Sequence, residues 1–168
     1  MSSPNFASLP ISPQQLEALQ GLGYASMTPV QAQSLPLILS GKDVIIQAKT
    51  GSGKTAAFGI GLLNRLNPRF FGVQALVMCP TRELAEQVGQ SIRQLASRMA
   101  NVKTLLLCGG KPFGPQRDSL HHGAHIVVGT PGRIQDHLQR GTLDLKGVRT
   151  FVLDEADRML EMGFAEVM

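Results

Sequence analysis

The stretch Ala48-Lys49-Thr50-Gly51-Ser52-Gly53-Lys54-Thr55 decides the fold, together with the apolar run Val44-Ile45-Ile46 just before it. This order predicts a strand, a glycine-rich turn and a helix, an arrangement that points several backbone N–H groups at a phosphate chain. Gly51 and Gly53 lack a side chain, so the backbone there can approach phosphates closely. The stretch therefore predicts a nucleotide-binding α/β protein.

Lys54 and Thr55 carry the charge and the hydroxyl that such a loop needs. The Lys54 ammonium would lie among the β- and γ-phosphates of ATP, and the Thr55 hydroxyl would bind the accompanying Mg²⁺. The general phosphate-loop pattern has glycine where this chain has Ala48, so a glycine-rich turn without nucleotide stays the alternative. The expected ATP contacts in the loop are Thr50, Gly51, Ser52, Gly53, Lys54 and Thr55.

A second acidic segment, Asp154-Glu155-Ala156-Asp157, follows the apolar run Phe151-Val152-Leu153. A carboxylate at the end of a buried strand is what a magnesium–nucleotide site needs, so Asp154 would hold the metal, through water. Glu155 would then orient or deprotonate the water that attacks the γ-phosphate. The alternative is that Asp154 or Asp157 merely caps the helix that follows.

Five short apolar runs alternate with segments of helical pattern, which predicts a mostly parallel sheet with helices on both faces. In such a sheet every strand-to-helix turn lies at the same edge, so the motifs at these turns should converge. The expected strands are Val44–Ile46, Ala75–Cys79, Thr104–Cys108, Ile126–Val128 and Phe151–Leu153.

Helix boundaries agree with this reading. Ser12-Pro13-Gln14-Gln15 predicts a helix start with a capping box, and Gly23 predicts its end. Thr130-Pro131 predicts a second start, and Gly141 the corresponding stop.

Composition limits the classes of protein to which the chain can belong. With 168 residues and 43% hydrophobic content, we expect one domain on one core. No apolar stretch approaches the roughly 20 residues of a membrane span, and the start Met1–Asn5 has no signal-peptide pattern, so a cytoplasmic protein without a membrane partner is expected. The net charge of +4 and the pI of about 9.4 favour polyanionic partners without identifying nucleic acid.

The chain resembles the DEAD-box RNA helicases, whose name the residues 154–157 spell in one-letter code. Ala48–Thr55 is also that family's form of the phosphate loop, which accounts for Ala48. The stretch Cys108–Leu120 further resembles one bacterial subgroup of the family. Other matches are Thr28-Pro29-Val30-Gln31 to the Q motif, Pro80-Thr81-Arg82-Glu83-Leu84 to motif Ia, Gly109-Gly110 to the glycine doublet and Thr130-Pro131-Gly132-Arg133 to motif Ib.

The resemblance implies a RecA-like P-loop lobe that uses ATP and Mg²⁺, with Lys54, Asp154 and Glu155 as catalytic residues. It also implies that Gln31 reads adenine, whereas spacing alone favours Gln31 as part of a helix cap. Phe6 stands at the separation of the family's isolated upstream aromatic and could stack on the base, with a small core contact as the alternative.

The resemblance also implies single-stranded RNA as a partner. Arg82 and Arg133 stand at helix starts, where the helix dipole disfavours cations, and a bound phosphate would relieve this mismatch. The alternative is that Glu83 or another acid pairs with each arginine. Contacts to the RNA backbone, with little sequence preference, are expected from Pro80, Thr81, Arg82, Gly109, Gly110, Thr130, Pro131, Gly132 and Arg133.

In terms of domains, residues 1–168 are expected to form the N-terminal helicase lobe, from the Q motif through the acidic motif. The family's Ser-Ala-Thr motif, its second lobe and any RNA-binding domain are not in this sequence. Because the second lobe supplies arginines to the γ-phosphate, the chain alone is expected to bind nucleotide with negligible turnover. The subgroup resemblance implies that the parent protein acts in large-ribosomal-subunit assembly.

Two other functions stay open at this stage. The chain could be a non-catalytic module that binds ATP or RNA as a switch or scaffold, although Glu155 argues against this for the parent protein. It could also belong to a DNA-directed motor with a related core, and the 2′-hydroxyl of RNA is the chemical difference that would separate the two substrates.

Overall fold

The computed structural model describes residues 4–168. The chain divides into two compact units, each described here by itself: unit 1 is Met1–Arg65 with Ser91–Ala100, and unit 2 is Leu66–Gln90 with Asn101–Met168. The length and hydrophobic content of the chain predicted one core. These two quantities carry no information about which residues contact one another. Of the start Met1–Asn5, the first three residues lie outside the described part.

Unit 1 is helical, with a 3₁₀ turn η1 (Phe6–Ser8) and the helices α1 (Pro13–Gly21), α2 (Pro29–Leu39) and α3 (Lys54–Asn64). The capping box predicted at Ser12 and Gln15 is present, and Gly23 has the positive φ of a helix-ending glycine (83°). Gly61 lets α3 approach α2 closely, because a Cβ there would collide with Ile38.

The strand predicted at Val44–Ile46 is not present, and this is a correction. Residues 42–49 carry no strand assignment within the described chain, and the Ile45 side chain is fully exposed. A three-residue apolar run becomes a strand only when another strand satisfies its backbone, and the run itself contains no information about a partner. The phosphate loop is therefore preceded by an extended segment outside any ladder.

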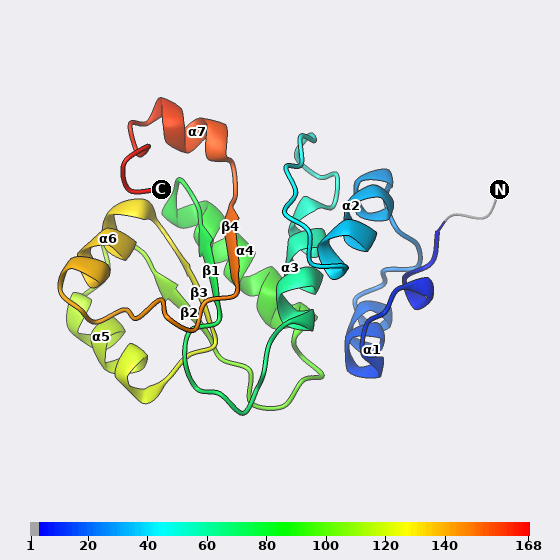
Figure 1. Cartoon of the computed structure of the whole chain (residues 1–168), viewed down its shortest axis with the longest axis horizontal. Coiled ribbons are helices and arrows are strands. Elements are labelled where there is room, and N and C mark those ends of the chain that lie inside the picture. Colours follow the sequence, from blue (N-terminus) through cyan, green and yellow to red (C-terminus); the bar gives the residue numbers. More distant parts are fainter. Residues whose placement is uncertain (1–3) are drawn as a thin grey trace. The chain divides into compact units, whose positions relative to one another are not determined.

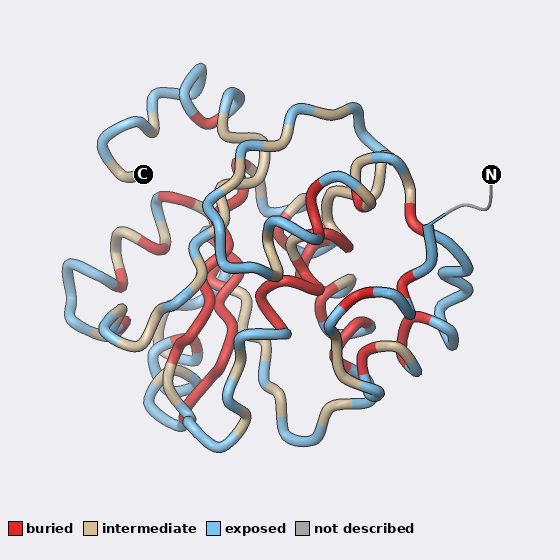
Figure 2. The backbone as a smooth tube through the Cα atoms, turned by 45° about the vertical axis from the view of Figure 1, so that its right-hand side comes forward, coloured by how far each residue is buried: buried red, intermediate tan, exposed pale blue. Residues whose placement is uncertain are grey.

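Unit 2 contains a four-stranded sheet in the order β2-β3-β1-β4, and all its pairs are parallel (Figure 1). The other four predicted strands are confirmed to within a residue. The two inner strands, β1 and β3, are buried along their whole length (Figure 2). The strands are β1 (Ala75–Met78), β2 (Thr104–Leu107), β3 (Ile126–Gly129) and β4 (Thr150–Leu153).

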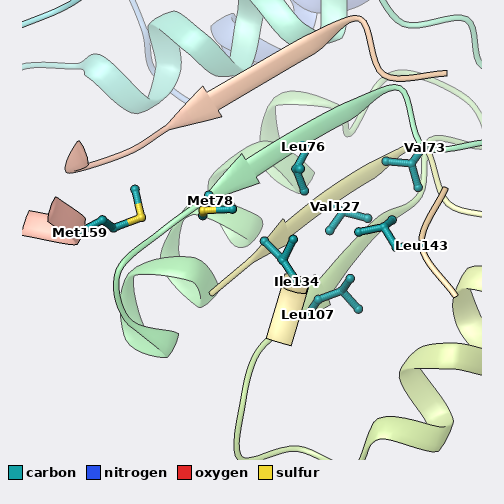
Figure 3. Packing of buried hydrophobic residues seen from close by; sticks show 8 residues of the cluster. All are labelled: Val73, Leu76, Met78, Leu107, Val127, Ile134, Leu143 and Met159. Carbon is teal, nitrogen blue, oxygen red and sulfur yellow. The ribbon is translucent and has the colours of Figure 1, made fainter. Parts of the chain in front are cut away.

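Helices cover both faces of this sheet, as predicted. On one face lies a cluster that includes Leu76, Val127 and Ile134 (Figure 3). Ile134 belongs to α6 (Pro131–Gln139), and Leu120 of α5 (Phe113–His122) packs against the cluster. On the other face, Gly89 of α4 (Arg82–Leu95) lies against Leu106 of β2. The cluster comprises Val73, Leu76, Met78, Leu107, Val127, Ile134, Leu143 and Met159.

The carboxyl ends of the four strands lie at one edge of the sheet, and the turns that follow them lead into α4, α5, α6 and α7 (Ala156–Glu161). The start predicted at Thr130-Pro131 and the stop at Gly141 (φ 73°) bracket α6 as expected. Within residues 4–168 no helix is long and apolar enough to cross a membrane.

Candidate nucleotide and RNA sites

The phosphate loop lies in unit 1 and has the backbone geometry of an anion cradle. Gly51 and Gly53 adopt positive φ (82° and 92°), and α3 begins at Lys54 with Gly53 as an N-cap that offers no side-chain hydrogen bond. The Ser52 hydroxyl is buried and finds no hydrogen-bond partner in the described chain. Uncapped helix N–H groups beside an unsatisfied hydroxyl suit a phosphate group, so these residues fit the nucleotide that the sequence predicts.

Lys54 and Thr55 open the first turn of α3, and both are half-buried. The Lys54 ammonium donates to the carbonyl of Ala48 at 2.9 Å, so the side chain folds back toward the first residue of the phosphate loop. The positive charge is therefore held over the same few residues that form the cradle.

Gln31 closes a capping box at the start of α2 and also grips the phosphate loop. Its Oε1 accepts from the Thr28 backbone N–H at 2.9 Å, and its Nε2 donates to the Gly53 carbonyl at 3.2 Å. The Thr28 hydroxyl donates to the Ser52 carbonyl at 2.7 Å. The cap that spacing favoured is confirmed, and Gln31 is only 1% exposed. Adenine recognition by Gln31 stays a prediction.

Phe6 is buried, with 2% of its surface exposed. The centroids of the Phe6 and Tyr24 rings lie 6.1 Å apart in an edge-to-face arrangement. This is the core contact that the sequence left as the alternative. Stacking of Phe6 on a base stays a prediction.

The acidic motif lies in unit 2 where β4 ends. The Asp154 N–H extends the β1–β4 ladder by donating to Met78 O at 3.0 Å. The N-cap position of α7 belongs to Glu155, in the left-handed region (φ 55°) and without a side-chain cap bond, so a cap formed by Asp154 is not the arrangement found. Asp157 instead accepts from the Arg158 N–H at 2.9 Å.

Two neighbours of the acidic motif carry information that the sequence did not. Arg158 pairs with Glu155, with Nη1 of Arg158 3.4 Å from Oε2 of Glu155. Burial and then the nearby charge of Asp154 raise the pKa of the Cys79 thiol far above its ordinary value. Cys79 therefore stays uncharged beside the carboxylates.

The turns after β1, β2 and β3 converge in unit 2, as predicted for motif Ia, the glycine doublet and motif Ib. The Gly109 N–H donates to the Thr130 hydroxyl at 3.3 Å, and that hydroxyl makes no capping bond to α6. Gly110 has a positive φ (81°), and a Cβ there would lie 3.5 Å from Nη1 of Arg82. These contacts gather three separate motifs on one edge.

The remaining members of these motifs lie on the same turns. Thr81 accepts from the Leu84 N–H at 3.3 Å, as a capping hydroxyl does. Pro80 and Pro131 are buried, and Gly132 is exposed at the start of α6.

The two arginines differ in their partners. Arg82 pairs with Glu86 at 3.1 Å, one helical turn along α4, so the alternative of an acidic partner holds for Arg82, although the partner is not Glu83. Arg133 lies 3.9 Å from Asp136 but donates at 2.7 Å to the Lys111 carbonyl and at 3.0 Å to Gln116 Oε1. Arg133 is thus held mainly by neutral acceptors, an arrangement that helix spacing does not reveal.

The phosphate loop belongs to unit 1 and the acidic motif to unit 2. Their meeting around one nucleotide, and the shared binding of a metal by Thr55 and Asp154, therefore stay predictions.

Comparison with known proteins identifies the class. A model of the DEAD/DEAH box helicases matches residues 28–168. The chain belongs to this family. It is 61% identical over 158 residues to the ATP-dependent RNA helicase DbpA of Escherichia coli K12, and 50% identical over 161 residues to DeaD of the same strain. DbpA is the bacterial subgroup that Cys108–Leu120 resembles, and this identity confirms the resemblance.

Solved structures confirm the RecA-like fold. A DEAD box protein from the hyperthermophile Methanococcus jannaschii superposes with a TM-score of 0.92 at 46% identity, covering 97% of this chain and 44% of that one. A Dbp5 variant from S. cerevisiae, bound to RNA and ADP BeF3, superposes with a TM-score of 0.90 at 30% identity, covering 98% of this chain and 42% of that one.

The chain spans about a third or less of the curated relatives it matches. It covers 35% of DbpA and 26% of E. coli DeaD, while 94% and 96% of this chain are aligned.

Proposed function

We propose that this chain is the ATP-binding and RNA-backbone-binding lobe of an ATP-dependent RNA helicase that couples ATP hydrolysis to local unwinding of RNA duplexes. The observation that carries the proposal is the phosphate loop, where an uncapped helix start, two glycines at positive φ and the buried Ser52 hydroxyl form a cradle. Thr28 and Gln31 hold this cradle by hydrogen bonds to the carbonyls of Ser52 and Gly53.

The chain's own residues would divide the work. The backbone N–H groups of Thr50–Thr55 and the Lys54 ammonium bind the phosphates. Glu155 orients the attacking water and accepts its proton, once its carboxylate leaves Arg158. Thr55 and Asp154 are the residues that would hold Mg²⁺, and the metal, when bound, neutralises charge that develops on the phosphates. Gln31 would select the adenine base.

RNA binding is proposed for the carboxyl edge of the sheet in unit 2. Gly109, Gly110 and Gly132 are exposed, so a phosphate can approach the backbone of these turns, and Arg82 and Arg133 supply charge. These groups suit phosphate oxygens, so contacts to the RNA backbone with little sequence preference are expected. The named partner of the S. cerevisiae Dbp5 variant, RNA, is consistent with this surface.

For the parent protein we propose a cytoplasmic helicase with a second lobe, acting on ribosomal RNA in assembly of the large ribosomal subunit. The 61% identity to DbpA supports this proposal. Without the second lobe, the chain should bind ATP and turn it over negligibly. The competing function is an ATP- or RNA-binding switch, and RNA-stimulated multiple turnover by the pure chain would contradict our expectation for the isolated lobe.

The experiment is thermal unfolding of the chain with Mg²⁺ and ADP, ATP or GTP. Saturation at about 100-fold over Kd adds about 2.7 kcal/mol to the free energy of unfolding, so adenine nucleotides should raise the Tm. Lys54→Ala should abolish this rise because it removes the phosphate-binding charge. GTP should give no rise if Gln31 selects adenine.

Each outcome has a distinct meaning. Equal stabilisation by GTP would reduce Gln31 to a helix cap and a support of the loop. If no nucleotide raised the Tm even at high concentration, the proposal that this chain binds nucleotide would be wrong, and only the proposed RNA surface would remain.

A further inference from the structure

A buried polar network lies beneath the RNA-facing turns of unit 2. Its centre is Gln116 on α5, 7% exposed, and His137 on α6, fully buried. The Gln116 amide reaches three groups: its Nε2 donates to the Cys108 carbonyl at 3.1 Å, and its Oε1 accepts from Arg133 Nη1 at 3.0 Å and lies 2.9 Å from His137 Nε2. One side chain thus joins the residue before the glycine doublet to the arginine of motif Ib.

The chemistry of the partners fixes the orientation of this amide. A guanidinium can only donate and a carbonyl can only accept, so Oε1 must face Arg133 and Nε2 must face Cys108. Since Oε1 cannot donate, the proton of His137 must be on Nε2. His137 Nδ1 lies 2.7 Å from the Thr142 hydroxyl, which also lies 3.1 Å from the His137 carbonyl. In the neutral ring Nδ1 carries no proton, so the single hydrogen of that hydroxyl is donated to Nδ1 and not to the carbonyl.

The ring of His137 cannot turn freely. Phe113 stacks on it with centroids 4.1 Å apart and planes 12° from parallel. The guanidinium of Arg140 lies 4.3 Å from the centre of the Phe113 ring. Burial and the charge of Arg133 lower the pKa of His137, which favours the neutral ring.

Arg133 uses up one end of its guanidinium inside this network. Both hydrogens of Nη1 are taken, one by the Lys111 carbonyl at 2.7 Å and one by Gln116 Oε1 at 3.0 Å. The side chain keeps 17% of its surface exposed. A guanidinium has five N–H donors, so donors beyond the two on Nη1 are left for a ligand.

We infer that Gln116 and His137 are positioning residues that hold Arg133 and the glycine doublet in the arrangement that binds the RNA backbone. This inference rests on the RNA-binding function proposed above. His137 acts through Gln116, and Gln116 acts through Arg133 and the Cys108 carbonyl. Neither residue needs to touch RNA itself.

The test is Gln116→Met, which keeps the length of the side chain and removes its hydrogen bonds. An isotope-labelled chain is titrated with a short single-stranded RNA and followed by NMR, at several salt concentrations. We expect binding about tenfold weaker, the effect of one lost hydrogen bond to a charged group. The slope of log K against log salt should fall by about 0.7, because one phosphate contact is lost. Arg133→Ala should also weaken RNA binding and lower the salt slope. The double variant Gln116→Met/Arg133→Ala should bind RNA no more weakly than Arg133→Ala alone.

Gln74→Met is the matched control. Gln74 is also buried, at 5% exposed, and its amide also makes three hydrogen bonds, to Asn67 and Phe70 at the opposite edge of the sheet. The same chemical change there should leave RNA binding and its salt slope unchanged.

A second pair of variants keeps the test independent of Gln116→Met. His137→Gln retains an N–H donor and should bind RNA like the wild type, whereas His137→Phe keeps the stack on Phe113 without a donor and should bind like Gln116→Met. Direct NMR of the wild-type ring should show the proton on Nε2. A proton on Nδ1 alone would overturn the inference.

Two failures are distinguishable. If the wild type and Gln74→Met bind RNA and Gln116→Met and His137→Phe bind equally well, the positioning role is wrong and the RNA surface stands. If the wild type binds no RNA, the proposed surface itself is wrong, and the positioning role falls with it.

Discussion

His137 shows how a single buried residue makes stability depend on pH. The ring is fully buried, and Arg133, Asp136 and Arg140 are the charged groups around it. Burial, followed by Arg133, lowers its pKa below the ordinary value of 6.5. The unfolded chain therefore binds a proton at a pH where the folded chain does not.

The direction of the pH effect follows. Above pH about 6.5 both states are neutral at His137, and the full stability is present. As the pH falls below that value the unfolded state gains the proton first, so the free energy of unfolding should decrease. Urea unfolding across this range should show the decrease in the wild type and a smaller one in His137→Gln. His122→Gln makes the same chemical change at an exposed position of α5 and is the comparison variant.

At the level of the elements, the starts of α1 and α2 are built alike but have different neighbours. Ser12 and Thr28 both cap their helices and both form a capping box with the glutamine three residues on. Only Thr28 also reaches the phosphate loop, through its bond to the Ser52 carbonyl at 2.7 Å. Comparing substitutions at Ser12 and Thr28 therefore distinguishes an effect on helix stability from an effect on the phosphate loop.

Thr28→Ala and Ser12→Ala should each lower the free energy of unfolding by about 1 kcal/mol, the usual effect of losing an N-cap. Only Thr28→Ala should also reduce the rise in Tm caused by ATP, because its loop contact is lost as well. Chemical denaturation and thermal unfolding with ATP measure the two effects. Equal responses to ATP in both variants would mean that Thr28 is only a cap.

The sequence predicted most elements because their cues are local. The four strands of the sheet are short apolar runs, and the starts of α1 and α6 carry Ser12-Pro13 and Thr130-Pro131. The expected strand at Val44–Ile46 failed because pairing depends on a partner that the run does not specify. Positive φ at Gly51 and Gly53 fits the expected loop.

The candidate site was predictable only in part. The motifs marked the turns after β1, β2 and β3, and the rule that these turns share an edge brought them together correctly. Gln116 and His137 were missed because polar residues on a helix ordinarily face solvent. Their burial depends on side chains of α5 and α6 meeting the backbone carbonyl of Cys108 in space, which no local pattern encodes.

On the scale of the whole molecule, a modest excess of positive charge accompanies a proposed RNA site made largely of backbone groups and arginines. The net charge of +4 and the exposed backbone at Gly109, Gly110 and Gly132 favour contact with phosphates in any sequence context. We therefore expect two RNAs of equal length and different sequence to bind with the same Kd at the same salt concentration.

Fluorescence anisotropy with labelled RNAs and a DNA of matching sequence measures this. Binding should weaken linearly in log K against log salt, and the DNA should compete less well because it lacks the 2′-hydroxyl. A strong preference for one RNA sequence would contradict backbone recognition. Equal competition by DNA would favour a motor directed at both nucleic acids.

The buried thiols have a practical consequence for all of these experiments. The chain has 2 cysteines, and burial raises the pKa of both Cys79 and Cys108 above the ordinary value. Neither presents a thiolate at neutral pH, so both should resist alkylating reagents. A cysteine introduced at exposed Gln139 on α6 would then be the one reactive thiol of the folded chain. A maleimide dye could be attached there without replacing either natural cysteine.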